Sequence, residues 1–291
     1  HGAGMTAGFD FNTYSGKIPV SGGRPHTDGS KTTISRKRIT EYSPYLTLSQ
    51  SLMDEMIVLN GGLRMSNSDL FHTGWVPQCG VSVNPGHGFN IKASLSKGYR
   101  NPSFRELYLY AMANPDLEPE SMMNYEVSLS RRFGTGATAS LTAYYCKGDN
   151  MIQTLDMKNQ NTGRFINKGI EASLGWQPVT SLSLSATYSY LHTSLRDLTG
   201  APRHQYYIGA DWRVSPTVNI GADLKGVSRL FVHESIDHQS YAVVNLKASW
   251  SACRHADLFV RIENLTDASY VINRGYDMPG LSVLGGFKLH F

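Results

Sequence analysis

Long apolar runs, charged residues and catalytic motifs are all scarce in this sequence. No segment approaches the roughly 18 consecutive apolar residues of a transmembrane helix, which excludes a helical membrane protein. Charged residues make up 17% of the chain, below the share of about a quarter that is usual in soluble domains. The net charge is only +4 and the basic residues are scattered, so we expect no nucleic-acid partner.

Cysteine pairs and enzyme motifs are missing as well. The three cysteines, Cys79, Cys146 and Cys253, form no CxxC pair, which excludes a zinc ribbon and a thioredoxin-like site. Neither a GxSxG nucleophile motif nor a P-loop occurs. The segment from His233 to His238 resembles HExxH but is one residue too long, and we expect it to be a loop rather than a helix. The sequence therefore predicts no enzyme, no cofactor and no metal centre.

What the chain does have is a repeated alternation of apolar and polar residues. In the segment 241–251, one face carries Ala242, Val244, Leu246, Ala248 and Trp250, and the other carries Tyr241, Asn245, Lys247 and Ser249. A period of two indicates a β-strand, because successive side chains point to opposite sides. The same alternation occurs in 89–96, 181–192, 218–225, 257–263 and 281–291.

Charged residues occupy the polar positions of the predicted strands. Examples are Lys92, Glu126, Glu171, Asp223, Lys247 and Arg261. A charged side chain fits badly in the packed core of a β-sandwich, where it loses its hydration. It fits well in a barrel whose lumen holds water and whose apolar face meets lipid.

The connections between the predicted strands alternate in length. Short turns are expected at 84–87, 133–136, 177–180, 214–217 and 253–255. Longer connections are expected near 15–37, 65–74, 100–121, 150–162, 196–201, 232–238 and 265–278. Short turns on one side and long loops on the other are typical of outer-membrane barrels. We therefore predict an all-β, transmembrane, antiparallel up-and-down barrel of about 14 strands, in contact with the lipid of a Gram-negative outer membrane.

The most specific local sequence lies between Ser96 and Glu126. It holds Tyr99-Arg100-Asn101-Pro102, then Glu106-Leu107-Tyr108, then Asn114-Pro115-Asp116-Leu117-Glu118-Pro119-Glu120. These elements, in this order, closely resemble the barrel of TonB-dependent outer-membrane receptors. Matches at 165–171, 263–270 and 280–291, the last ending on Phe291, extend the resemblance over most of the chain from about Trp75 onward.

Simple physical roles fit these motif residues. Tyr99 and Arg100 are expected to end a strand at the membrane interface, and Pro102 ends the ladder because it has no N–H to donate. The prolines of the return path restrict the loop, and Glu106, Glu120 and Arg105 are expected to form ion pairs within it. We therefore interpret the following residues as structural: Tyr99, Arg100, Pro102, Glu106, Asn114, Pro115, Leu117, Pro119, Glu120 and Phe291.

The resemblance also implies a function and partners. Receptors of this family take up a scarce ligand actively, with a plug domain in the lumen that is moved by the TonB complex. The ligand expected first is a ferric siderophore, followed by cobalamin or another metal complex. Residues 1–291 contain no plug-like region and no signal peptide, so we expect one barrel segment, the C-terminal portion of a larger barrel, with the plug as a missing partner.

Five residues are candidates for contact with a metal chelate. They are Arg105, Tyr108, Met112, His72 and His233. Thioether and imidazole groups suit soft metals, although methionines also fill irregular apolar gaps. Some family members bind haem through a histidine in the loop that corresponds to 104–114, and this segment has none. The alternatives are a passive porin or adhesin, a non-functional fragment, a barrel enzyme and a soluble β-sandwich.

Overall fold

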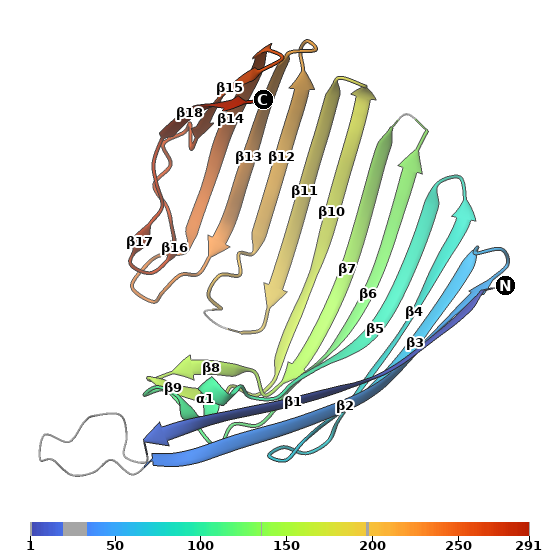
Figure 1. The fold of residues 1–291 in the computed structure, drawn as a ribbon, viewed down its shortest axis with the longest axis vertical. Helices are drawn as coiled ribbons and strands as arrows, with labels where there is room; N and C mark the ends of the chain where they lie inside the picture. The colour runs from blue at the N-terminus through green and yellow to red at the C-terminus, as the bar shows by residue number, and fades with distance from the viewer. Residues whose placement is uncertain (1, 20–33, 135, 196–197, 291) are drawn as a thin grey trace, which may run out of the picture. The chain divides into compact units, whose positions relative to one another are not determined.

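The computed structural model describes residues 2–19, 34–134, 136–195 and 198–290. Fourteen of its strands form one antiparallel sheet, in which each strand lies beside its neighbours in chain order (Figure 1). The strands, in this order, are β1 (Ala3–Pro19), β2 (Ile34–Leu52), β3 (Ile57–Ser68), β4 (Gly74–Gly86), β5 (Phe89–Arg100), β6 (Glu120–Phe133), β7 (Ala137–Asp149), β10 (Phe165–Val179), β11 (Leu182–Thr193), β12 (His204–Arg213), β13 (Val218–Leu230), β14 (Gln239–Cys253), β15 (Ala256–Glu263) and β18 (Ser282–Leu289). The predicted strand number and all-β class are confirmed.

The chain divides into two compact units, which are described separately. The first consists of 1–84, 92–126 and 145–166, and the second of 85–91, 127–144 and 167–291. Within the described ranges, no helical segment has the length and apolar character that a membrane crossing requires.

The first unit shows two distinct sheet faces. In register across β1 to β4, Ala7, Leu46, Leu63 and Pro77 form an apolar row. The opposite face carries polar side chains, among them Asp10, whose Oδ2 lies 2.6 Å from Nη1 of Arg64. The period-two pattern of the sequence thus becomes one apolar and one polar surface.

The second unit repeats this separation over β12, β13, β14, β15 and β18. One row across these strands is apolar throughout and consists of Ala210, Ala222, Leu246, Ile262 and Val283. The next row lies on the opposite face and consists of Asp211, Gly221, Lys247, Arg261 and Leu284. On that face Nζ of Lys247 lies 2.7 Å from Oδ1 of Asp211. The predicted grouping of Asp223, Lys247 and Arg261 on one polar face is confirmed, with Leu284 as an apolar exception.

The alternation of short and long connections is also confirmed, except between β3 and β4. Short turns join β2 to β3, β4 to β5, β6 to β7, β10 to β11, β12 to β13 and β14 to β15. The β4–β5 turn needs positive φ at both central residues, 53° at His87 and 77° at Gly88. A side chain at Gly88 is not tolerated, because a Cβ there lies 2.1 Å from the carbonyl oxygen of Arg132.

One sequence expectation about the connections is wrong, and one turn was not predicted. The predicted long connection at 65–74 is short, because the β3–β4 ladder continues to the pairing of Ser66 with Gly74. The turn at 53–56 was not predicted, since it contains neither glycine nor proline. Met53, Asp54 and Glu55 form it with φ angles of 53°, 52° and 66°, which are uncommon for residues other than glycine, asparagine and aspartate.

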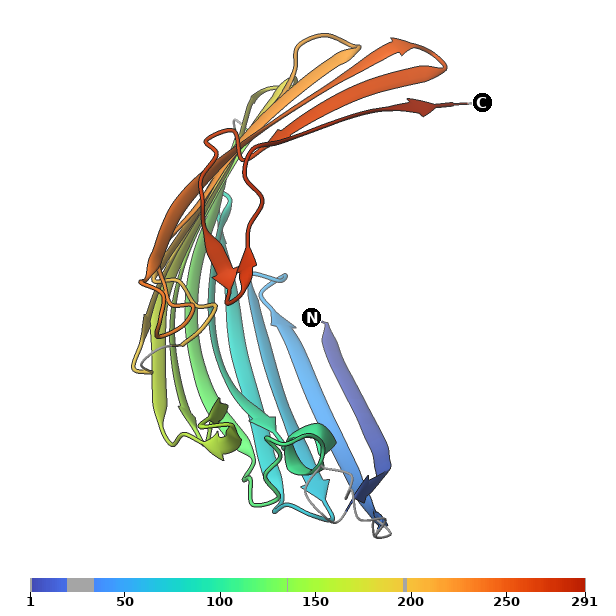
Figure 2. The ribbon, with the colours of Figure 1, turned by 90° about the vertical axis from the view of Figure 1, so that its left-hand side faces the viewer.

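Three of the long connections contain secondary structure of their own. The helix α1 (Phe104–Tyr108) lies between β5 and β6, and the hairpin of β8 (Ile152–Leu155) and β9 (Lys158–Asn161) lies between β7 and β10. The hairpin of β16 (Val271–Asn273) and β17 (Tyr276–Asp277) lies between β15 and β18. Figure 2 shows this last hairpin leaving the sheet before the chain returns as β18.

Candidate functional site

The helix α1 organises the predicted motif residues of the first unit. Ser103 caps it: the Ser103 hydroxyl accepts from the amide of Glu106 at 3.3 Å, and Oε2 of Glu106 accepts from the amide of Ser103 at 2.7 Å. This reciprocal pair is a capping box. The Ser-x-x-Glu pattern at 103–106 is visible in the sequence and indicates the start of a helix. The sequence analysis did not predict this helix.

Arg100 joins this helix to the start of the return strand. Its guanidinium donates to both carboxylate oxygens of Glu106, at 2.8 and 3.1 Å, and to Oε2 of Glu120 at 2.6 Å. The expected ion pairs of Glu106 and Glu120 therefore form with Arg100 as the cation. Arg105 was expected in these pairs, but its guanidinium lies 4.8 Å from the ring centre of Tyr110 instead.

The charge of Glu106 is stabilised by these contacts. Partial burial alone raises the pKa of its carboxyl group, but the hydrogen bonds from Arg100 and Ser103 outweigh burial and hold the pKa below its ordinary value. The carboxylate is therefore ionised at neutral pH, and the loop keeps a charged link between α1 and β5.

The return path is held by an amide and a small apolar cluster. Asn114 is buried; its Nδ2 donates to the carbonyl of Asn159 at 2.8 Å, and its Oδ1 accepts from the amide of Asp116 at 3.1 Å. Leu107 and Leu117 form a buried cluster with Ile39 of β2. Among the motif prolines, Pro102 is buried, Pro119 is half-buried and Pro115 is exposed.

Four of the five ligand candidates lie in the first unit. Tyr108 packs edge-to-face on Phe104 at 5.3 Å, and burial followed by the charge of Asp69 raises the pKa of Tyr108. Met112 is half-buried, and its carbonyl accepts from the amide of Asn159 at 2.8 Å. His72 is exposed, and its carbonyl accepts from the hydroxyl of Tyr99 at 3.0 Å.

The fifth candidate, His233, lies in the second unit and already has partners. Its Nε2 accepts from Nη1 of Arg274 at 2.8 Å, and its Nδ1 lies 2.9 Å from the hydroxyl of Ser235. No group of three or more His, Cys, Asp and Glu residues able to hold a metal occurs in the part of the chain that the structure describes. Phe291 lies outside the described residues.

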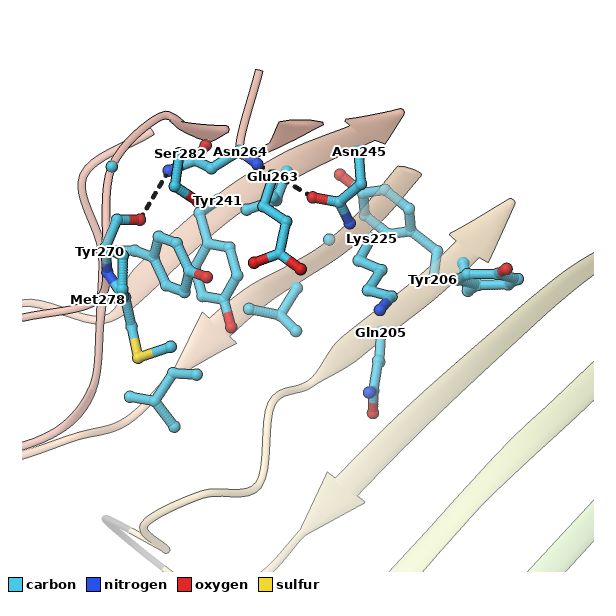
Figure 3. Close-up of a pocket in the computed structure, with 17 residues that line it drawn as sticks. Gln205, Tyr206, Lys225, Tyr241, Asn245, Glu263, Asn264, Tyr270, Met278 and Ser282 are labelled. Atoms are coloured by element: carbon cyan, nitrogen blue, oxygen red, sulfur yellow. Dashed lines mark hydrogen bonds between the residues drawn. The ribbon is translucent and has the colours of Figure 1, made fainter. Parts of the chain in front are cut away.

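The second unit contains a pocket that the sequence analysis did not identify. Its volume is about 530 Å³, and its wall is the polar face of β12, β13, β14 and β15. The connection 264–281 supplies the rest of the lining, including Tyr270, Ile272 and Met278. In Figure 3 the side chains of Lys225 and Glu263 point into the space between the two tyrosines Tyr241 and Tyr270 and the amide of Gln205.

Asn264 and Asp267 fix the connection over this wall. Asn264 is only 3% exposed, and its Nδ2 donates to the carbonyls of Ala268 at 2.9 Å and Pro279 at 3.1 Å, so it ties both ends of the connection together. Asp267 Oδ1 accepts from the amide of Leu281 at 2.8 Å. The ring of Tyr270 then stacks on that of Tyr241, with centroids 3.9 Å apart.

One wall of this pocket could be predicted from the sequence. Lys225, Asn245 and Glu263 all fall on polar positions of alternating segments, so their common face was readable. The return of a loop over that face depends on the bonds of Asn264, which no periodicity encodes.

Comparison with known proteins agrees with the fold. The family model described as TonB dependent receptor-like, beta-barrel matches residues 2–265. The "Vitamin B12 transporter BtuB" of Photobacterium profundum is 26% identical over 250 residues, which cover 80% of this chain and 40% of that protein. The "Iron-regulated outer membrane virulence protein" of Vibrio cholerae is 25% identical over 230 residues, covering 67% of this chain and 34% of that protein.

Solved structures share the same architecture. The siderophore receptor PirA from Acinetobacter baumannii superimposes with a TM-score of 0.82 at 17% identity, covering 99% of this chain and 52% of that one. A variant of the ferric enterobactin receptor from Pseudomonas aeruginosa gives a TM-score of 0.78 at 17% identity, with 98% and 50% covered. The chain thus spans about half of these structures, and 40% or less of the two curated relatives named above. On the family match and the 14-stranded sheet together, the chain belongs to the TonB-dependent receptor β-barrel family of the outer membrane.

Proposed function

We propose that this chain is the C-terminal barrel portion of a receptor that takes up a scarce metal complex actively across the outer membrane. The complex is a ferric siderophore, cobalamin or another metal chelate. The observation that carries the proposal is the pocket on the polar face of the second unit, built where β13 and β15 run into long connections. A barrel of this family that recognises a ligand needs such a site on its lumen side.

The two faces of the sheet define the environment of each residue. The apolar rows, such as that of Leu246 with Ala222 and Ile262, meet the lipid, which solvates hydrocarbon side chains without cost. The polar face meets the lumen, where a plug domain is the proposed partner and the TonB complex acts through it. The charged side chains proposed to line the lumen are Lys92, Glu126, Glu171, Asp223, Lys247 and Arg261.

The α1 region is proposed as a rigid scaffold for the external loops. Arg100 links Glu106 and Glu120, and the buried Leu107 anchors the helix. The exposed Arg105 and the half-buried Tyr108 lie on this helix, so they remain proposed contacts for an arriving chelate. Met112, His72 and His233 remain proposals of the same kind.

The experiment that tests the proposal is uptake of radioactive iron and cobalt complexes by cells with and without the gene for this chain. Each strain is measured with and without an uncoupler of the inner-membrane proton gradient. Active uptake predicts that both the deletion and the uncoupler abolish accumulation of one complex. Accumulation that persists with the uncoupler, together with steady ion conductance of the purified protein, establishes the passive porin instead.

A further inference from the structure

The pocket of the second unit has balanced charge. Of its 17 lining residues, the charged ones are Lys225 and Glu263. Each of them already has an oppositely charged neighbour outside the lining. Nζ of Lys225 lies 3.9 Å from Oδ2 of Asp223, and Oε1 of Glu263 lies 3.3 Å from Nη1 of Arg261. The pocket therefore presents one cation, one anion and no excess of either.

The other lining groups favour an uncharged ligand with both apolar and polar parts. Tyr241 and Tyr270 stack on each other, so the pair presents its outer surface to the pocket, and Met278 lies beside it (Figure 3). Gln205 supplies an amide that donates and accepts hydrogen bonds. Asn245 is already committed, since it donates to Asp223 at 2.8 Å and accepts from the amide of Asn264 at 3.0 Å.

A highly anionic complex does not match this surface. A trianion that enters a partly desolvated site loses hydration, so its binding requires several unpaired cations. Any anionic side chain in the site opposes this binding. Here Glu263 itself repels an anion, and Lys225 alone opposes that effect. Aromatic faces combined with single hydrogen-bonding groups are instead the usual lining of sites for neutral organic ligands.

We infer that this pocket recognises a metal complex with no net charge, through apolar contact with the outer surface of the Tyr241–Tyr270 pair and hydrogen bonds that Gln205 and Lys225 donate and Glu263 accepts. The inference rests on the proposed uptake function and narrows its substrate class. Two kinds of complex have this chemistry: iron tris-hydroxamates without an ionised side group, and cyanocobalamin, both of which carry amide groups and are uncharged overall. Trianionic iron tris-catecholates lie outside the class.

The test measures binding to isolated outer membranes that contain the polypeptide as it occurs in its source cell. The probes are an iron tris-hydroxamate, cyanocobalamin and an iron tris-catecholate. The first two are neutral, and comparing them shows which of the two kinds of neutral complex the pocket binds. One neutral probe is expected to bind saturably. Replacing Tyr270 by alanine is expected to weaken that binding about tenfold. Tyr276→Ala, an equally aromatic change on the same connection but outside the pocket, is the control and is expected to leave it within about twofold.

A second variant keeps the test decisive if Tyr270→Ala disturbs the connection. Glu263→Gln preserves the shape of the side chain and removes the anion, so it is expected to raise affinity for the tris-catecholate severalfold. Glu234→Gln, an exposed carboxylate outside the pocket, is the matched control and is expected to change nothing.

Two results overturn the inference and differ in what else they overturn. If the tris-catecholate binds tightest and neither Tyr270→Ala nor Glu263→Gln changes its affinity, the pocket assignment is wrong while the uptake function stands. If none of the three complexes binds and none accumulates in cells, the proposed function is wrong and the inference is wrong with it.

Discussion

A lysine at position 246 provides the most direct test of which sheet face meets the lipid. Leu246 lies near the middle of β14 (Gln239–Cys253) and sits in register between Ala222 and Ile262, both apolar. If this row crosses the membrane midplane, Leu246→Lys brings a charge into hydrocarbon and is expected to lower the free energy of unfolding by about 2–4 kcal/mol. The measurement is reversible unfolding of the protein in lipid vesicles with increasing denaturant.

Two adjacent positions of β14 form a matched pair for this test. Ala248 pairs with Ile220 and Val260 on the apolar face, and Ser249 pairs with Asn219 and Phe259 on the polar face. Lysine at 248 is expected to destabilise strongly, and lysine at 249 only slightly. Their depth differs by a single residue, about 3.4 Å, so depth does not account for the difference. Equal losses at both positions refute the two-face assignment.

Asn245 is a poor control, although the alternation alone makes it the obvious one. Its amide bonds to both Asp223 and Asn264. Asn245→Lys removes the acceptor of the buried Asn264 amide, which costs about 1–3 kcal/mol regardless of the lipid.

Three further predictions concern the connections. An unfolded glutamate has a pKa of about 4.3, and folding lowers the pKa of Glu106 below this value. The ion pair of Glu106 therefore stabilises its loop fully at a pH above about 4.3. This stabilisation is lost as the pH falls through the pKa of the folded state. The rate of proteolysis of this loop should therefore rise in acid. In the Glu106→Gln variant the rate should be high at every pH. A wild-type rate that does not depend on pH contradicts this prediction. Leu107→Ala, at a fully buried position, should cost about 2–5 kcal/mol of local stability by the same assay, whereas Leu109→Ala, at an exposed one, should be near neutral. Asn264→Ala should raise the rate of amide hydrogen exchange across 264–281, because it removes hydrogen bonds worth about 1–3 kcal/mol. The exposed control Asn273→Ala should leave this rate unchanged. If the two variants exchange at the same rate, Asn264 does not hold the connection in place.

The strands were predictable because a barrel strand is long and its two faces meet different solvents. In β14, Ala242, Val244, Leu246, Ala248 and Trp250 fall on one face of the observed register, and Val243 is an apolar exception on the other. The same logic failed at 53–56, where the turn is made by Met53, Asp54 and Glu55 under the constraint of the ladder. Turn geometry imposed by neighbouring strands leaves no signature in composition.

The candidate site was predictable only in part. The elements around Arg100 and Glu106 were readable as a motif, and the Ser103 capping box was present in the sequence. The partner of Glu120 was not readable, since Arg100 lies 20 residues earlier in the chain. The pocket depends on the return of 264–281 over β12–β15, a long-range arrangement that Asn264 holds through side-chain bonds to main-chain atoms.

The most direct test of the central claim is the intact mass of this polypeptide, and of anything that co-purifies with it, from the outer membranes of the source cell. Because this chain spans about half of the solved receptors named above, membership of a plug-bearing, TonB-driven receptor predicts a polypeptide of about twice the 32.2 kDa of these residues, or a plug-bearing partner held tightly to it. A species of 32.2 kDa that is isolated without a partner and conducts ions steadily contradicts the account.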